Sequence, residues 1–388
     1  GMLAACPQLD NSTEKPQERP MSQRGRPYIL LLAANVAWCA LWVWYRIAVD
    51  VQILPYPHFL VDYSYGFIRR GLVGAITALF LPKVPIAVVY GFGVAACLLA
   101  LLLYLMLFRR DFGFSRRTLP LLVLVAGSPF FFKNFFYNLG YFDVLGCIVA
   151  LAALLLPVGA AYPLVLAAAS VALVFAHHIH LLLYVPTIAF IALVRYGAAD
   201  GRLHAPRLAW CGALLLCVGA AFLFVMAHAT PPVPEAAFLA HMKARALDPF
   251  HEPYAFVWYR TPNQEWQDTL RMLPRNLAQA PLYALMLAAH WPLLRFFRQT
   301  LAGLSAPDRR LAFTGLGAII AGYAVIFVMV FDYSRWVSSG LICLWLALHV
   351  IRALPSAKPV ALPEMTGATL SFAILVTLLG RVGTVTPF

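Results

Sequence analysis

Residues 85–108 read PIAVVYGFGVAACLLALLLYLMLF and contain no charged side chain. A helix needs about 20 apolar residues to cross the hydrocarbon core of a bilayer, so this run predicts a transmembrane helix. The whole chain has the same character, because 62% of its 388 residues are hydrophobic and only 12% are charged. Soluble domains carry about 25% charged residues. The sequence therefore predicts an all-α, polytopic membrane protein that folds as a helical bundle.

Further apolar segments have the length or composition of membrane helices, and the shorter ones would be partly buried in protein. Together with the first run they predict about 11 transmembrane helices. The additional candidate spans are 28–49, 118–132, 142–157, 161–176, 179–195, 208–228, 279–296, 311–331, 334–352 and 367–380.

Three hydrophilic regions lie outside these spans. Residues 1–27 are polar and rich in proline, which predicts a disordered cytoplasmic tail. Residues 28–388 are expected to form a single transmembrane domain with two outer loops, at 50–84 and 229–278. The second loop is far longer than the other connections, and loops of that length are usually functional or disordered.

Both outer loops contain segments that predict helices at the membrane surface. The run Gly71–Leu81 is too short to span and follows two arginines, so we expect an interfacial or re-entrant helix. A twelfth full span is the alternative, and it would reverse the orientation of part of the chain. In the long loop, amphipathic pieces near Pro234–Leu247 and Gln264–Gln279 predict helices that lie on the membrane as a lid.

The orientation follows from the basic loops. Lysine and arginine collect at 109–117, 195–207, 295–310 and 352–358, which the positive-inside rule places in the cytoplasm together with the N-terminus. The net charge of +13 is thus explained by membrane topology, and we expect no nucleic-acid partner. No CxxC pair occurs among the seven cysteines, so the sequence predicts neither a zinc site nor a disulfide framework.

The stretch 62–76, DYSYGFIRRGLVGAI, brings charged residues to the outer side of the membrane. Asp62 is a candidate general base, because partial burial raises the pKa of a carboxylate. An ion pair with Arg69 or Arg70 is the alternative. The two arginines predict phosphate binding, with a snorkelling anchor as their alternative role. The same stretch supplies two candidate substrate-binding residues, Tyr63 and Tyr65.

The aromatic segment 129–143, PFFFKNFFYNLGYFD, also falls on the outer side. Aromatic faces and amide groups are suited to hold a sugar ring, but the same composition is typical of an interfacial belt. Asp143 begins an apolar span, so it is either a substrate contact or a favourable charge at a helix N-terminus. The candidate substrate contacts here are Lys133, Asn138 and Asp143.

Three histidines, His177, His178 and His180, lie at the junction of two spans. They are candidate contacts for a lipid phosphate. His177 and His180 are spaced i, i+3, so a divalent metal is possible if a carboxylate joins them. A structural role is the third alternative.

Two later segments also contribute candidate site residues on the outer side of the membrane. FDYSRWVSSGLI places Asp332 and Arg335 one helical turn apart at the start of a span, where they either neutralise each other or leave Arg335 free for a phosphate. In the long loop, the strip PFHEPYAFVWYRTP offers Arg260. Asp332 and Arg260 are further candidate substrate contacts.

These features resemble the C-type superfamily of integral-membrane glycosyltransferases (GT-C) over most of residues 28–350. A first span leads to an acidic outer loop, YFDVLGCIVALAALLL is similar to the acid-led middle helix of the family, and DYSRW is similar to its late ERY-type signal. The resemblance implies that Asp62 deprotonates the acceptor and that outer arginines or histidines hold the donor phosphate. Family members often carry a second acid after the first, where this chain has YSYG.

The resulting hypothesis is a membrane glycosyltransferase that moves a sugar from a polyprenyl-phosphate donor to a glycan, lipid or protein acceptor. It implies a multi-pass protein of the bacterial inner membrane with an active site facing the periplasm, without an obligatory cofactor. The alternatives are a polysaccharide polymerase or ligase acting on lipid-diphosphate glycans, a transporter or flippase, and a non-catalytic membrane subunit. Transporters place charges at mid-membrane on broken helices, whereas here the charges cluster at one face.

Overall fold

The computed structural model describes residues 26–49, 54–198, 204–330 and 332–362, and within these ranges every regular element is a helix. The predicted all-α class is thereby confirmed. Most of the predicted tail 1–27 and the candidate span 367–380 lie outside the described residues.

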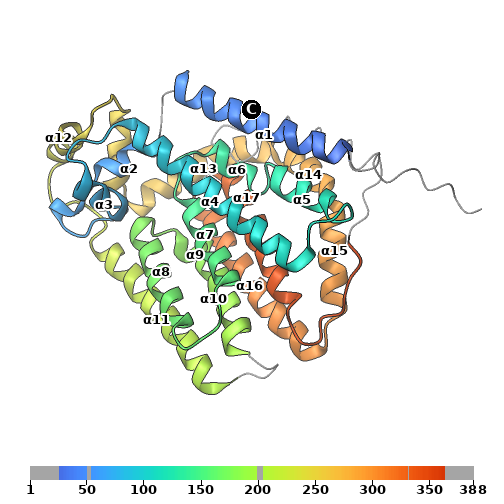
Figure 1. Cartoon of the computed structure of the whole chain (residues 1–388). Helices are drawn as coiled ribbons and strands as arrows, with labels where there is room; N and C mark the ends of the chain where they lie inside the picture. Colours follow the sequence, from blue (N-terminus) through green and yellow to red (C-terminus); the bar gives the residue numbers. More distant parts are fainter. Residues whose placement is uncertain (1–25, 50–53, 199–203, 331, 363–388) are drawn as a thin grey trace, which may run out of the picture.

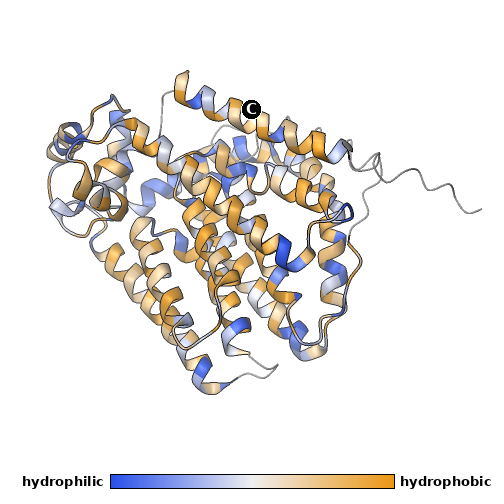
Figure 2. Ribbon diagram, in the orientation of Figure 1, coloured by the Kyte–Doolittle hydropathy of each residue, from blue (hydrophilic) through white to orange (hydrophobic). Residues whose placement is uncertain are grey.

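Five of the described helices are long and apolar enough to cross a membrane. They are α1 (Arg26–Ala48), α4 (Ile86–Phe112), α11 (Ala205–Ala227), α16 (Ala306–Met329) and α17 (Tyr333–Ile351). Hydrophobic residues cover most of their length (Figure 2). The chain is therefore a helical membrane protein, while the larger count of about 11 spans stays a prediction.

The other predicted spans form shorter helices, and proline explains two of the breaks. The segment 179–195 divides at Tyr184 into α9 (His180–Leu183) and α10 (Val185–Ala192), which continues as η2 (Leu193–Gly197). The segment 279–296 divides at His290 into α14 (Ala280–Ala289) and α15 (Trp291–Ala302). Pro186 and Pro292 are the second residues of the new helices, where a missing N–H costs nothing. The remaining short helices in the predicted spans are α5 (Leu119–Gly127), α7 (Asp143–Leu155) and α8 (Tyr162–Ala176).

The bundle core forms where α4 packs on α7, α8 on α11, and α16 on α17. Close approach depends on small residues, because an added Cβ at Gly322 would lie 2.5 Å from the carbonyl oxygen of Leu182. The helix α1 lies across one end of the bundle at a steep angle to α8 and α11 (Figure 1). It contacts α5 and α6 (Lys133–Tyr137).

The two long loops fold against each other, and we call residues 54–84 and 229–260 the loop module. Its helices are α2 (Tyr56–Leu60), η1 (Tyr63–Tyr65), α3 (Leu72–Phe80), α12 (Glu235–Arg245) and η4 (Glu252–Trp258). They share a hydrophobic cluster that includes Phe59, Phe238 and Trp258. The backbone nitrogen of Val84 donates to the carbonyl of Arg245 at 2.7 Å, which joins the two loops directly.

Helices occur in each of the predicted surface segments: α3, α12, and α13 (Pro262–Ala278) after the loop module. Nine residues of α3 are too few to cross a bilayer. Their position at a membrane surface stays a prediction.

Candidate functional site

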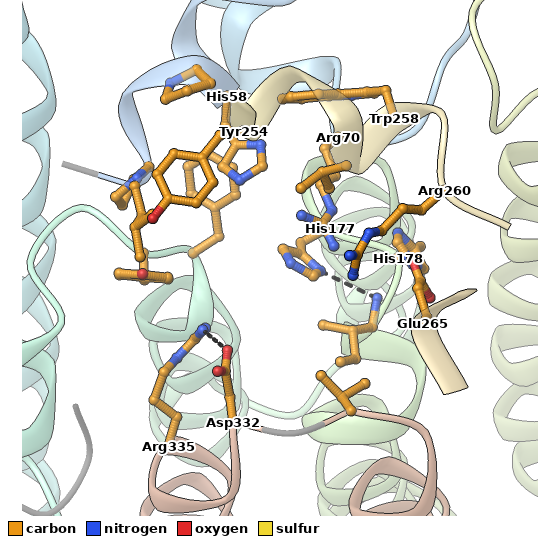
Figure 3. A pocket seen from close by; sticks show the side chains of 18 of the residues that line it. His58, Arg70, His177, His178, Tyr254, Trp258, Arg260, Glu265, Asp332 and Arg335 are labelled. Carbon is orange, nitrogen blue, oxygen red and sulfur yellow. Dashed lines mark hydrogen bonds and ion pairs between the residues drawn. The ribbon is translucent and has the colours of Figure 1, made fainter. Parts of the chain in front are cut away.

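A cavity of about 230 Å³ lies at the end of the bundle beside the loop module (Figure 3). Its wall is assembled from segments that are far apart in the sequence. The predicted topology places all of these segments on the outer side of the membrane. The lining residues come from 54–58, 140–142, 177–179, 254–265, 329–330 and 332–336, together with Arg70.

Arg70 is the most unusual residue of the cavity wall. Its φ angle of 62° is positive, and no other described non-glycine residue has a positive φ. The left-handed backbone costs about 1–2 kcal/mol for a residue with a Cβ atom. Residues kept in such a conformation cluster at ligand sites, where the surrounding structure holds them in place.

The guanidinium of Arg70 points into the cavity beside His177 and His178 (Figure 3). Burial lowers the pKa of Arg70 to about 10, and the neighbouring Arg69 adds to the shift. The group is therefore still a cation at neutral pH. Within the described parts of the chain no hydrogen bond or ion pair satisfies it, and its Nε is buried without a partner. Arg70 is half-buried, and an unpaired cation that is partly removed from water favours an anionic partner.

Three neutral histidines share the cavity lining with Arg70. Burial, with the charge of Arg70 second, holds the pKa values of His58, His177 and His178 well below the usual range. The rings of His177 and His178 stack with centroids 5.5 Å apart. Nδ1 of His58 and Nδ1 of His178 are buried and have no hydrogen-bond partner. An oxygen-rich ligand would satisfy them.

Arg335 forms the opposite part of the cavity wall and is already neutralised. Its Nη2 donates to Oδ2 of Asp143 at 2.7 Å, and its Nη1 donates to Oδ2 of Asp332 at 2.8 Å. The rings of Tyr141 and Trp336 lie 4.1 Å and 4.6 Å from its central carbon. This guanidinium is fixed in place and is not free for a phosphate.

Asp332 lines the cavity just before α17, outside the helix itself. Burial raises the pKa of its carboxyl group, although Arg335 acts in the opposite direction. Asp332 therefore has the properties of a general base that is poised closer to neutral pH than an ordinary aspartate.

Asp62, the predicted base, does not line the cavity. It pairs with Arg245 at 3.0 Å and with His241 at 3.3 Å, rather than with Arg69 or Arg70. Burial alone would raise the pKa of Asp62, but hydrogen bonding to Ser64 and the two basic partners hold it below its usual value. The structure thus gives Asp62 the environment of a structural ion pair inside the loop module.

Arg69 does not line the cavity either. It donates to the carbonyl groups of Val257 and Arg260 and forms an ion pair with Glu265 at 3.5 Å. Since these partners lie in the long loop, Arg69 fastens the first outer loop to the second one.

The predicted site residues divide into two groups. Those that line the cavity are Arg70, His177, His178, Arg260, Asp332 and Arg335. Those that lie outside its lining are Asp62, Tyr63, Tyr65, Arg69, Lys133, Asn138, Asp143 and His180.

Most of the residues outside the lining have polar partners elsewhere. His180 faces the carbonyl of Phe142 at 3.1 Å, and Lys133 donates to Asn35 of α1 at 2.9 Å. In the same buried polar cluster as Lys133, Asn138 donates to Oδ1 of Asn134 at 2.6 Å. The ring of Tyr65 packs on His241 in the loop module. Among the described residues no group of three or more histidine, cysteine, aspartate or glutamate side chains is arranged to hold a metal.

The lining also contains His58 and Glu265, which were not among the predicted site residues. His58 is the one histidine of the stretch PYPHFLV, which was a usable signal. Glu265 lies in the first turn of α13, where an acidic residue is expected for helix stability alone.

No family model, no curated protein and no solved structure matches this chain. Its class therefore rests on its own helices: it is a helical membrane protein with a basic cavity at one end of the bundle.

Proposed function

We propose that this protein is a GT-C-like membrane glycosyltransferase that takes a sugar from a polyprenyl-phosphate donor. The unpaired guanidinium of Arg70, held in a strained backbone conformation inside the cavity, is the observation that carries the proposal. The proposed setting is a bundle of about 11 spans in a bacterial inner membrane, with a cytoplasmic N-terminus and the cavity facing the periplasm.

The phosphate would bind where Arg70, His177 and His178 converge. A guanidinium grips two phosphate oxygens at once, and a hydrogen bond between charged groups is about twice as strong as a neutral one. Each buried donor left without a partner costs about 1–3 kcal/mol. Phosphate oxygens would remove that cost for Arg70 and for His178.

In the proposed reaction the acceptor hydroxyl oxygen attacks the anomeric carbon of the donor sugar. The bond from that carbon to the phosphate oxygen breaks, and its electron pair leaves with the lipid phosphate. Asp332 takes the acceptor proton, while Arg70 stabilises the charge that grows on the phosphate. We assign the base role to Asp332 rather than Asp62 because Asp332 lines the cavity and has a raised pKa.

Binding of undecaprenyl phosphate to the protein in nanodiscs tests the phosphate site. Arg70→Gln removes the unpaired cation, so we expect affinity to fall at least about tenfold. Arg275→Gln is the matched control, since Arg275 is exposed on α13 and does not line the cavity. Equal affinity of the Arg70→Gln protein and the control would refute the proposal.

A polymerase or ligase that uses lipid diphosphates is the second candidate. A further guanidinium, that of Arg260, lines the cavity near Arg70 and His178 (Figure 3). It would have to leave its ion pair with Asp268 to bind a second phosphate group. Undecaprenyl diphosphate binding about tenfold tighter than the monophosphate, with the difference lost in Arg260→Gln, would favour this candidate.

A further inference from the structure

A second hollow, the polar groove, lies next to the cavity and has a volume of about 510 Å³. The first turns of α13 supply most of its lining, including the exposed amides of Asn263 and Gln267. Glu235 of α12 also lines it. The groove is thus built from the long outer loop, whose length suggested a functional role.

The charged groups of the polar groove neutralise one another. Asp268 pairs with Arg260 and, at 3.2 Å, with Arg271. With Glu235 the groove holds two carboxylates and two guanidinium groups, so it has no net charge. The lining of the cavity differs, because the cation of Arg70 is unpaired there among the described residues. Amides and paired charges offer both donors and acceptors, which suits a ligand rich in neutral hydroxyl groups.

The polar groove and the cavity share Arg260 in their linings. Arg69 donates to the backbone carbonyl of Arg260 at 3.2 Å, which fixes that shared wall. A capping box at the start of α13 fixes the helix as well: the backbone nitrogen of Thr261 donates to the Gln264 side chain at 2.9 Å. A ligand in the groove would therefore lie beside the cavity in a pre-organised site.

We propose that the polar groove binds the acceptor of the transfer reaction and that this acceptor is a neutral, hydroxyl-rich glycan. The reaction rests on the function proposed above, but glycan binding by the groove is measured separately from it. A lipid acceptor would need an apolar groove, and a polyanionic glycan would need an excess of cations. Neither feature is found in the lining of the groove.

Binding of the full chain in detergent to immobilised oligosaccharides tests the proposal. The panel contains neutral glucan, mannan, galactan and arabinan fragments, and acidic polygalacturonate fragments. We expect binding to at least one neutral fragment, and the double variant Asn263→Leu with Gln267→Leu should weaken it at least about tenfold. Gln299→Leu, the same change at an exposed glutamine of α15, should leave it unchanged.

The outcomes separate this proposal from the function on which it rests. Absence of binding to every neutral fragment, preference for the acidic fragments, or insensitivity to the double variant would overturn the glycan groove. Arg70→Gln should leave glycan binding intact, because Arg70 does not line the groove. If undecaprenyl phosphate binding depends on Arg70 while no glycan binds, the proposed function stands and only the groove assignment falls.

Discussion

Arg335 and Asp143 lie 192 residues apart in the sequence, and their side chains meet at 2.7 Å between the starts of α17 and α7. Both side chains are almost fully buried, with 5% and 4% exposure. The contact fixes one side of the cavity, because Arg335 also holds Asp332 at its rim.

Arg335 pairs with both Asp143 and Asp332. Removing this cation should destabilise the protein more than removing one of the two acids. Arg335→Met leaves two buried carboxylates without their partner, a type of change that costs about 3–5 kcal/mol. Asp143→Asn keeps a group that accepts hydrogen bonds and leaves Arg335 paired with Asp332. Thermal unfolding in nanodiscs compares the two variants. A melting temperature that falls equally in both would contradict the shared ion-pair arrangement.

The strained backbone of Arg70 predicts a gain of stability together with a loss of binding. Arg70→Gly relieves the positive φ, whereas Arg70→Ala keeps the strain, so the glycine variant should be more stable by about 1 kcal/mol. Both variants should lose undecaprenyl phosphate binding, because both remove the guanidinium. The alanine variant is the matched control, and equal melting temperatures for the two would show that the left-handed conformation costs nothing.

The approach of α16 to α9 can be tested with a pair of glycines. Gly322→Ala would place a methyl group 2.5 Å from the backbone oxygen of Leu182, so a helix has to shift. We expect a loss of stability of about 1–3 kcal/mol, as for other overpacked cores. Gly317→Ala on the same helix meets no atom within 4 Å and should be neutral or slightly stabilising. Thermal unfolding distinguishes the two.

The sequence predicted the helical membrane class, because that class follows from where apolar residues fall along the chain. Of its candidate site residues, some line the cavity and others, including Asp62, do not. The sequence did not predict the helix breaks at Tyr184 and His290, because apolar residues lie on both sides of each break. Pro186 and Pro292 were usable signals for these breaks.

The sequence also did not predict which residues the charged side chains pair with. Asp62 pairs with Arg245, 183 residues away, because the loop module folds two distant loops together. Spacing within one segment could only suggest the nearby Arg69 and Arg70.

The pairing of Asp62 predicts a stability effect with a defined pH dependence. In the folded protein the pKa of Asp62 is lowered from 3.8. Its contribution to the stability of the folded protein is therefore fully present above that value and is lost as the pH falls through the lowered pKa. Asp62→Asn should therefore loosen the loop module at neutral pH, and the difference from the wild type should shrink in acid. Hydrogen exchange of α12 measures it. A difference that stays constant down to strongly acidic pH would contradict the ion pair.

The assignment of the base predicts opposite results for two aspartates. Asp332→Asn should abolish glycosyl transfer while undecaprenyl phosphate still binds, because the neutral amide cannot accept the acceptor proton. Asp62→Asn should retain transfer at reduced stability. The control is Asp332→Glu, which keeps a carboxylate in the cavity and should restore part of the activity.

The pH profile of transfer adds a readout that a structural role of Asp332 would not produce. A base works only when it is ionised, and burial raises the pKa of Asp332 above 3.8. The rate should therefore fall on the acidic side at a higher pH than an ordinary aspartate would give, and Asp332→Glu should move that limb. Loss of transfer in Asp62→Asn, with normal turnover in Asp332→Asn, would return the base role to Asp62. That outcome would also require the loop module to open, because in this structure Arg245 and His241 cover the Asp62 carboxylate.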